Sequence, residues 1–411
     1  MSKAKSYEIS KQIVWESYEQ VKANKGAAGI DQCTIKDFES NLKNNLYKLW
    51  NRMSSGSYFP APVQRVEIPK SDGGIRVLGI PTITDRIAQT VAKKHLEPAL
   101  EQLFHQDSYG YRPNRSAHQA LAVTQQRCWE HDWVIDLDIK GFFDNIPHEL
   151  MMRAVKKHTQ EPWIELYVER WLTAPIQTKE EASEARTQGT PQGGVISPLL
   201  ANLFLHYAFD HWMQTHYPGN PFERYADDVI VHCSTESEAL KLKASIAERL
   251  IECGLQLHPE KTKIAYCKDA NRKLEHPVTS FEFLGYCFRP RLSRNRYGKF
   301  FVNFLPAISP KSKKAIYAEI KKCHFHRKSH LSVKELANLL NPTVRGWIQY
   351  FGAFYKSALS FLKYHIDELL YRWVVRKYKK HGANAKKVTA WIDRIKRDYP
   401  RLFAHWELFN V

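Results

Sequence analysis

Ten residues near the middle of the chain are the strongest guide to its fold. They read Phe222-Glu223-Arg224-Tyr225-Ala226-Asp227-Asp228-Val229-Ile230-Val231. Side chains alternate between the two faces of a strand, so adjacent acids cannot share one face of a regular strand. The Asp-Asp pair therefore belongs in the tight turn of a hairpin, where the backbone can splay both carboxylates. Taken alone, the pair is equally compatible with a plain surface turn.

A second segment also places carboxylates in an apolar run. It reads Trp133-Val134-Ile135-Asp136-Leu137-Asp138-Ile139-Lys140-Gly141-Phe142-Phe143-Asp144. Ionised acids in such surroundings are costly unless they bind a metal or pair with a cation. Nucleotidyl transfer needs carboxylates of this kind, because fixed oxygens must hold two divalent ions about 4 Å apart. Mg²⁺ suits such oxygen-rich, partly hydrated sites.

The bulk properties point to a basic globular protein. Lys and Arg number 61 against 43 Asp and Glu, which gives a formal net charge of +18. A surplus this large indicates a polyanionic partner, nucleic acid first. The 7 cysteines are scattered without a Cys-x-x-Cys pair, which argues against a disulfide framework and a ribbon-type zinc site. With no apolar signal segment or membrane-spanning run, we expect a cytoplasmic protein with no membrane partner.

Periodicity divides the chain into three predicted regions. Residues 1–62 read as a helical N-terminal extension, broken at Lys25-Gly26-Ala27-Ala28-Gly29. Residues 63–305 begin with a hairpin signature and then alternate short apolar strands with helical stretches, which predicts an α+β domain. Residues 306–411 carry apolar stripes at helical spacing with basic flanks, which predicts a separate helical domain with a short basic C-terminal segment.

Several motifs follow one another in a recognisable order. The two acidic segments resemble motifs A and C of reverse transcriptases, and residues 187–199 resemble motif B of the group II intron type. Residues 70–81, 108–116, 257–263 and 281–286 resemble the family's fingers motif, a further fingers segment, motif D and the primer grip. Residues 345–351 resemble the thumb, or maturase, domain that grips intron RNA. The chain therefore looks like a bacterial group II intron reverse transcriptase/maturase over roughly residues 20–406.

The resemblance implies a right-hand polymerase fold and a set of site residues. Fingers and a palm with an antiparallel sheet and a Tyr-Ala-Asp-Asp hairpin would precede an all-α thumb/maturase domain. In the family a bulky aromatic lies five residues beyond the first catalytic Asp, and counting back from Phe143 selects Asp138 over Asp136. Asp136 would then be a supporting acid or the partner of a basic residue. The catalytic set would be Asp138, Asp227 and Asp228, and these residues with Ile139 would hold two Mg²⁺ ions.

The remaining assignments also come from the resemblance. The nucleotide would contact Lys70, Arg76, Phe143, Gln192 and Gly193, and the ring of Phe143 would exclude a ribose 2′-hydroxyl. Lys261 or Lys263 would be the general acid, with the choice left open. The template or other RNA would contact Arg112, Arg115 and Arg345.

The expected partners are an RNA template, a DNA primer or target, and dNTPs. The template is expected to be group II intron RNA, and binding should weaken steeply with salt. Two alternatives remain open: a non-catalytic RNA-binding splicing maturase, and a reverse transcriptase recruited for host defence. The chain stops before the His-Asn-His endonuclease of some members, so we expect DNA nicking to come from elsewhere. Cys323, His324, His326 and His330 also raise a zinc interpretation, which the sequence disfavours because no second ligand pair is evident.

Overall fold

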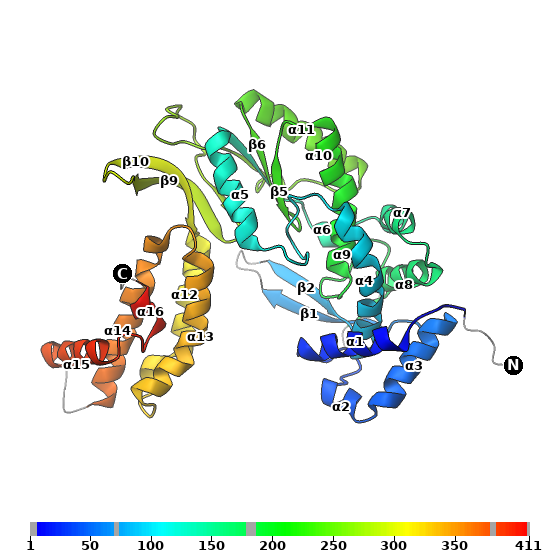
Figure 1. Ribbon diagram of the computed structural model, residues 1–411, viewed down its shortest axis with the longest axis horizontal. Coiled ribbons are helices and arrows are strands. Elements are labelled where there is room, and N and C mark those ends of the chain that lie inside the picture. Colours follow the sequence, from blue (N-terminus) through cyan, green and yellow to red (C-terminus); the bar gives the residue numbers. More distant parts are fainter. Residues whose placement is uncertain (1–5, 70–73, 178–185, 379–383, 409–411) are drawn as a thin grey trace. The chain divides into compact units, whose positions relative to one another are not determined.

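The computed structural model describes residues 6–69, 74–177, 186–378 and 384–408 (Figure 1). It divides into two compact units, the first comprising residues 1–116, 137–231 and 236–262 and the second residues 117–136, 232–235 and 263–411. The domain boundaries predicted after residues 62 and 305 remain a prediction. Within the described ranges, no helix is both long and apolar enough to cross a bilayer.

The first unit begins with the predicted helices and hairpin. The helices are α1 (Lys11–Ala23), α2 (Ile35–Glu39) and α3 (Leu42–Ser55). The strands β1 (Val63–Pro69) and β2 (Ile75–Ile80) pair antiparallel, with Gln64 opposite Ile80. Helix α4 (Ile83–Leu103) follows, and its N-terminus is capped by the Thr82 hydroxyl, which accepts from the Asp85 amide.

The rest of this unit surrounds a second hairpin. Its strands β5 (Phe222–Tyr225) and β6 (Asp228–Cys233) are antiparallel over residues 222–231. The other elements are α6 (Phe142–Asn145), α7 (His148–His158), α8 (Pro162–Thr173), β4 (Ile176–Gln177), α9 (Ser197–Leu205), the π-helical turn η1 (His206–Asp210), α10 (His211–His216) and α11 (Glu236–Glu252). Strand β4 extends the first hairpin into a three-stranded sheet of order β2-β1-β4.

The start of α9 does not follow the usual capping pattern. A Ser followed by Pro is typical of a helix cap and first turn, but Ser197 is the first residue of α9 and its buried hydroxyl accepts from Thr190 instead. The side-chain oxygen of Gln89 accepts from the Val195 amide at 2.7 Å and so holds the segment just before the helix. A contact with a residue more than 100 positions away cannot be inferred from the local sequence.

The second unit contains two groups of paired strands. Helix α5 (Ala117–Glu130) leads into β3 (Trp133–Leu137), which pairs antiparallel with β7 (Lys263–Tyr266). Three further strands, β8 (Phe281–Phe283), β9 (Tyr286–Arg294) and β10 (Phe300–Ile308), form an antiparallel sheet of order β10-β9-β8. Strands β9 and β10 make a long ribbon (Figure 1).

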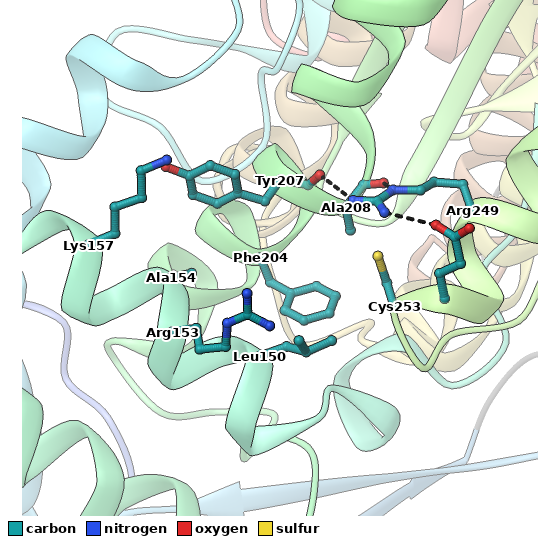
Figure 2. Close-up of a pocket in the computed structure, with 10 residues that line it drawn as sticks. Leu150, Arg153, Ala154, Lys157, Phe204, Tyr207, Ala208, Arg249 and Cys253 are labelled. Atoms are coloured by element: carbon teal, nitrogen blue, oxygen red, sulfur yellow. Dashed lines mark hydrogen bonds and ion pairs between the residues drawn. The ribbon is translucent and has the colours of Figure 1, made fainter.

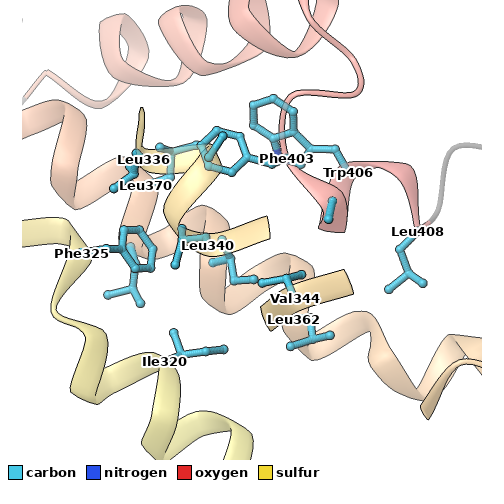
Figure 3. Packing of buried hydrophobic residues seen from close by; sticks show 14 of the residues in the cluster. Ile320, Phe325, Leu336, Leu340, Val344, Leu362, Leu370, Phe403, Trp406 and Leu408 are labelled. Carbon is cyan, nitrogen blue, oxygen red and sulfur yellow. The ribbon is translucent and has the colours of Figure 1, made fainter. Parts of the chain in front are cut away.

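The C-terminal part of this unit is helical, as predicted. It contains α12 (Pro310–Cys323), η2 (Phe325–Arg327), α13 (Val333–Phe351), η3 (Lys356–Leu359), α14 (Ser360–Lys377), α15 (Ala385–Asp398) and α16 (Ala404–Glu407). Their apolar faces meet in one core, where Leu336, Leu362 and Phe403 pack together (Figure 3). Each such buried side chain contributes about 1.5–3 kcal/mol. The predicted class, α+β followed by helices, is confirmed.

Candidate active site

The two adjacent aspartates lie at the turn of the second hairpin. Tyr225 pairs with Asp228, so Ala226 and Asp227 form a two-residue loop between β5 and β6. Ala226 has φ +59°, in the left-handed region that a residue with a Cβ adopts at a cost. A positive φ at the first loop residue is typical of a type II′ turn, whose twist matches that of the strands. The turn therefore displays both carboxylates on a strained backbone.

A buried ion pair lies directly beneath this turn. Arg224 and Asp210 both have fully buried side chains, and the carboxylate oxygens of Asp210 lie 2.7 Å from Nε and 2.5 Å from Nη2 of Arg224. The Nη1 atom of Arg224 donates to the Ala226 carbonyl at 3.1 Å and to the side chain of Asn202 at 2.9 Å. The guanidinium thus ties the strained turn to the helical segment of Asn202 and Asp210.

The sequence did not reveal the roles of Asn202, Asp210 and Arg224. The available signal was a charged residue inside an apolar strand, which needs a buried partner. Because Asp210 is 14 residues away in the chain and lies on η1, its identity as that partner could not be inferred. A π-helical turn within a helix is rare and occurs often at functional sites.

The segment 107–111 presses against the same turn. The Tyr109 amide donates to the Arg224 carbonyl at 2.8 Å, and the Arg224 amide donates to the Asp107 carbonyl at 2.9 Å. Gly110 comes so close that an added Cβ would lie 2.4 Å from the amide nitrogen of Ala226. Glycine is therefore required at position 110 for this approach.

Asp138 is held at the end of β3 by its main chain. Its carbonyl accepts from the His258 amide at 2.7 Å, and its amide lies 3.3 Å from the Thr262 hydroxyl. The next residue, Ile139, forms an isolated bridge with Leu257. These contacts fix the backbone from which the Asp138 side chain extends. The side chain itself is partly exposed.

Neighbouring charges act on Asp227, one of the predicted catalytic residues. Burial raises the pKa of the Asp227 carboxyl above its ordinary value, and the negative charge of Asp138 raises it further. The positive charges of Arg76 and Arg224 act in the opposite direction. Burial and the charge of Asp227 likewise raise the pKa of the Tyr111 phenol. The charges of Asp138 and Arg76 therefore act on Asp227, and the charge of Asp227 acts on Tyr111.

The donor set fits a divalent cation. Asp138 and Asp227 are hard oxygen donors whose charges oppose one another, so a bound cation would stabilise both. Within the described ranges, no three His, Cys, Asp or Glu side chains are gathered into a metal cage. Mg²⁺ is usually held by one or two carboxylates, with water and substrate phosphates completing the shell. Two carboxylates are therefore enough protein ligands for such a site.

Comparison with known families identifies the family of the chain. A family model described as reverse transcriptase (RNA-dependent DNA polymerase) matches residues 68–288, which is more than half of the chain. The chain belongs to the reverse transcriptase family. A second model, the group II intron maturase-specific domain, matches residues 313–391. The predicted family and the right-hand polymerase fold are thereby confirmed, and reverse transcriptases generally use divalent metals.

Individual relatives agree with the family. Protein YkfC of Escherichia coli is 31% identical over 323 residues, covering 67% of this chain and 80% of the relative. The group II intron-encoded protein LtrA of Lactococcus lactis subsp. cremoris is 34% identical over 203 residues, covering 49% of this chain and 33% of LtrA. The putative COX1/OXI3 intron 2 protein of Saccharomyces cerevisiae is 28% identical over 240 residues, covering 55% of this chain and 28% of that protein. The matched regions thus span only about a third of the two intron proteins.

Motif B of this reverse transcriptase packs on the residues that follow Asp138. The Thr190 amide donates to the Phe143 carbonyl at 2.7 Å, and Nε2 of Gln192 lies 3.4 Å from the Asp144 carboxylate. Gly193 has φ +126°, and a Cβ there would lie 2.8 Å from the Gly79 carbonyl oxygen. The loop therefore brings Phe143, Gln192 and Gly193 together beside β2, the strand that carries Arg76.

The predicted RNA contacts differ in accessibility. Arg112 is 9% exposed, and its guanidinium pairs with Glu101 at 3.0 Å and donates to the Ser108 carbonyl at 2.8 Å. These internal contacts favour a structural role for Arg112, because its donors are already engaged. Arg115 is exposed, as is Arg345 on α13 in the second unit. Lys70 lies outside the described residues.

The two candidate lysines of motif D are also placed differently. Lys261 Nζ lies 4.0 Å from the nearer carboxylate oxygen of Asp138. Lys263 belongs to β7 and stands opposite Asp136 in the β3–β7 register, consistent with Asp136 as the partner of a basic residue. Lys261 is therefore the lysine that the first unit places beside Asp138, a predicted catalytic residue.

A separate pocket of about 430 Å³ opens between α7, α9, η1 and α11 (Figure 2). Its walls include Phe204, Tyr207 and Cys253, with Arg153 on its rim. Arg249 fills one side, donating to the carbonyls of Tyr207 and Ala208 that the π-helical turn leaves available. The residues that line the pocket include none of the predicted site residues.

Proposed function

We propose that this chain copies RNA into DNA, adding dNTPs to a primer at Asp138, Asp227 and Asp228 with two Mg²⁺ ions. The observation that supports the proposal most is that the Asp138 charge raises the pKa of Asp227, which lies in a turn strained at Ala226. A bound cation would stabilise two carboxylates that repel one another. When bound, the ions would supply activation of the primer hydroxyl and stabilisation of the leaving pyrophosphate.

The surrounding residues have proposed roles that follow from their positions. Arg76 would steady the triphosphate, because its charge already acts on Asp227. Phe143 would lie under the sugar and exclude ribonucleotides, with its backbone held by Thr190. Lys261 would donate a proton to the leaving pyrophosphate, since its ammonium group is close to Asp138. Gln192 and Gly193 would shape the nascent base pair.

The helical C-terminal region would bind group II intron RNA. Its match to the maturase-specific model and the exposed Arg345 on α13 support this assignment. The net charge of +18 supports a nucleic-acid partner for the whole chain. A splicing role and polymerisation are compatible, since they would use different parts of the chain.

Primer extension on an RNA template tests the polymerase proposal. We expect the wild type to extend a DNA primer with Mg²⁺ and dNTPs and to fail with rNTPs. Asp227→Asn should abolish extension while leaving template–primer binding intact, and Phe143→Ala should admit rNTPs. A folded wild type that binds template–primer but does not extend it would refute the proposal and leave a splicing maturase as the better account.

A further inference from the structure

The β9–β10 ribbon carries an exposed cluster of aromatic and basic side chains at its tip. Arg294 pairs with Phe300, and Leu292 pairs with Val302 on the same face one step away. Phe300 is 62% exposed, and Tyr297 in the connecting turn is 77% exposed. Large aromatic side chains with this exposure are unusual unless something covers them.

The ribbon is anchored at its base and ordered at its tip. Phe288 and Phe304 are fully buried near the start of the ribbon, where the Phe281 ring stacks on Phe288 at 4.7 Å. In the turn, the Asn295 side chain accepts from the amides of Tyr297 and Lys299, both at 2.9 Å. The backbone of the tip is therefore ordered before binding, which lowers the entropy cost of binding.

The charge of this region is of one sign. No acidic residue occurs between Glu282 and Glu319, whereas the strands and turn carry Arg289, Arg291, Arg294, Arg296 and Lys299. A protein partner would have to pair these charges with acidic residues across the contact. A ribbon whose own charged side chains are all positive complements a phosphate backbone directly.

Arginine and aromatic side chains are paired at the tip. The Arg296 guanidinium lies 4.7 Å from the centre of the Tyr297 ring, and that of Arg294 lies 5.8 Å from the Phe300 ring. Rings and guanidinium planes together stack on unpaired bases, whose faces a duplex would cover. We propose that the β9–β10 tip is a binding site for single-stranded nucleic acid, in which Tyr297 and Phe300 stack on bases and the basic residues contact phosphates.

The proposal goes beyond polymerisation and is tested without it. Binding of single-stranded RNA and DNA 15-mers of one sequence would be measured by fluorescence anisotropy, with the metal chelated and no dNTP. A DNA 15-mer of the same charge that lacks bases separates stacking from phosphate contact. The test variant is Tyr297→Ala/Phe300→Ala. The matched control is Phe59→Ala, an equally exposed ring that lies 3.7 Å from the Arg170 guanidinium elsewhere.

The double variant should bind the base-bearing strands about tenfold or more weakly and the abasic strand as the wild type does. Comparison of the RNA and DNA arms shows which strand the tip prefers. Arg294→Ser/Arg296→Ser should lower the salt slope of binding by about 1.4, because each phosphate contact on a single strand contributes about 0.7. Phe300→Trp should retain affinity, and its added emission over the wild type's should be quenched by base-bearing strands only.

Two results would overturn the proposal. One is unchanged affinity of the double variant for both base-bearing strands, or an equal loss on the abasic strand. The other is a change in sedimentation of the double variant with oligonucleotide affinity intact, which would make the tip a contact between copies of this chain. Because the substituted side chains are exposed, each variant should have the same melting temperature as the wild type.

Discussion

The buried ion pair beneath the catalytic turn gives the sharpest test of how the site is built. Asp210→Asn removes the carboxylate whose two oxygens lie 2.7 and 2.5 Å from Arg224, while both positions are fully excluded from solvent. Breaking a buried pair by removing one partner costs about 3–5 kcal/mol, because the remaining charge loses its compensation. Against a typical domain stability of about 5–15 kcal/mol, that loss should be plain in denaturant unfolding.

The same substitution should lower activity in the protein that stays folded. Nη1 of Arg224 holds the Ala226 carbonyl at 3.1 Å, and Ala226 keeps a left-handed φ of +59° only while its surroundings impose it. Without Asp210 the guanidinium can reorient, and the turn can relax. A displacement of about 1 Å at reacting groups can cost about 100-fold in rate. We therefore expect kcat for primer extension to fall about 100-fold, with KM for template–primer nearly unchanged.

Two further variants separate the effect of Asp210 on the position of the turn from its effect on the stability of the protein. Glu368→Gln removes an exposed partner 2.5 Å from Arg372 and should cost less than about 1 kcal/mol. The double variant Asp210→Leu/Arg224→Met should regain most of the stability, as apolar replacements of buried pairs often do. It should not regain activity, because no guanidinium would reach Ala226. Unfolding free energy and kcat of Asp210→Asn both close to wild type would contradict this reasoning.

Three further changes test other parts of the molecule. Gly110→Ala places a Cβ 2.4 Å from the Ala226 nitrogen, so extension should be lost while the far-ultraviolet circular dichroism of the whole chain stays close to that of the wild type. Lys261→Gln should lower kcat about 100-fold, whereas Lys263→Gln, opposite Asp136, should stay near wild type in single-turnover assays. Burial opposes ionisation of Asp367, but hydrogen bonds from His405, Lys396 and Trp406 prevail and lower its pKa to about 2. The stability gained by a lowered pKa is present above the unfolded value of about 3.9 and is lost as pH falls towards 2. Asp367→Asn should therefore remove roughly 2 kcal/mol of unfolding free energy near pH 7, and this deficit should shrink between about pH 4 and 2.

The sequence predicted what local rules determine. Adjacent acids between two strand-like pieces required a turn, and that turn lies at Ala226 and Asp227. Apolar stripes placed α13 and α14 correctly, because a helix has one buried face. Contacts between segments that are distant in the chain could not be inferred from such local patterns. Arg112 resembled a template contact by its motif, yet Glu101 pairs with it. Motif D left the choice between Lys261 and Lys263 open, and the structure places Lys261 near Asp138 and Lys263 on β7 opposite Asp136.

The turn at Ala226 and Asp227 also shows that the motif contains the carboxylates of the proposed site but not the residues that position them. A buried ion pair adds little net stability compared with apolar packing, so stability alone does not explain Asp210 and Arg224. Their contact with Ala226 does, because a strained turn persists only where its surroundings over-determine it. Three segments, residues 107–111, 202–210 and 224–226, meet there through hydrogen bonds. The carboxylates would supply the proposed chemistry, but their positions depend on side chains that the motif does not contain.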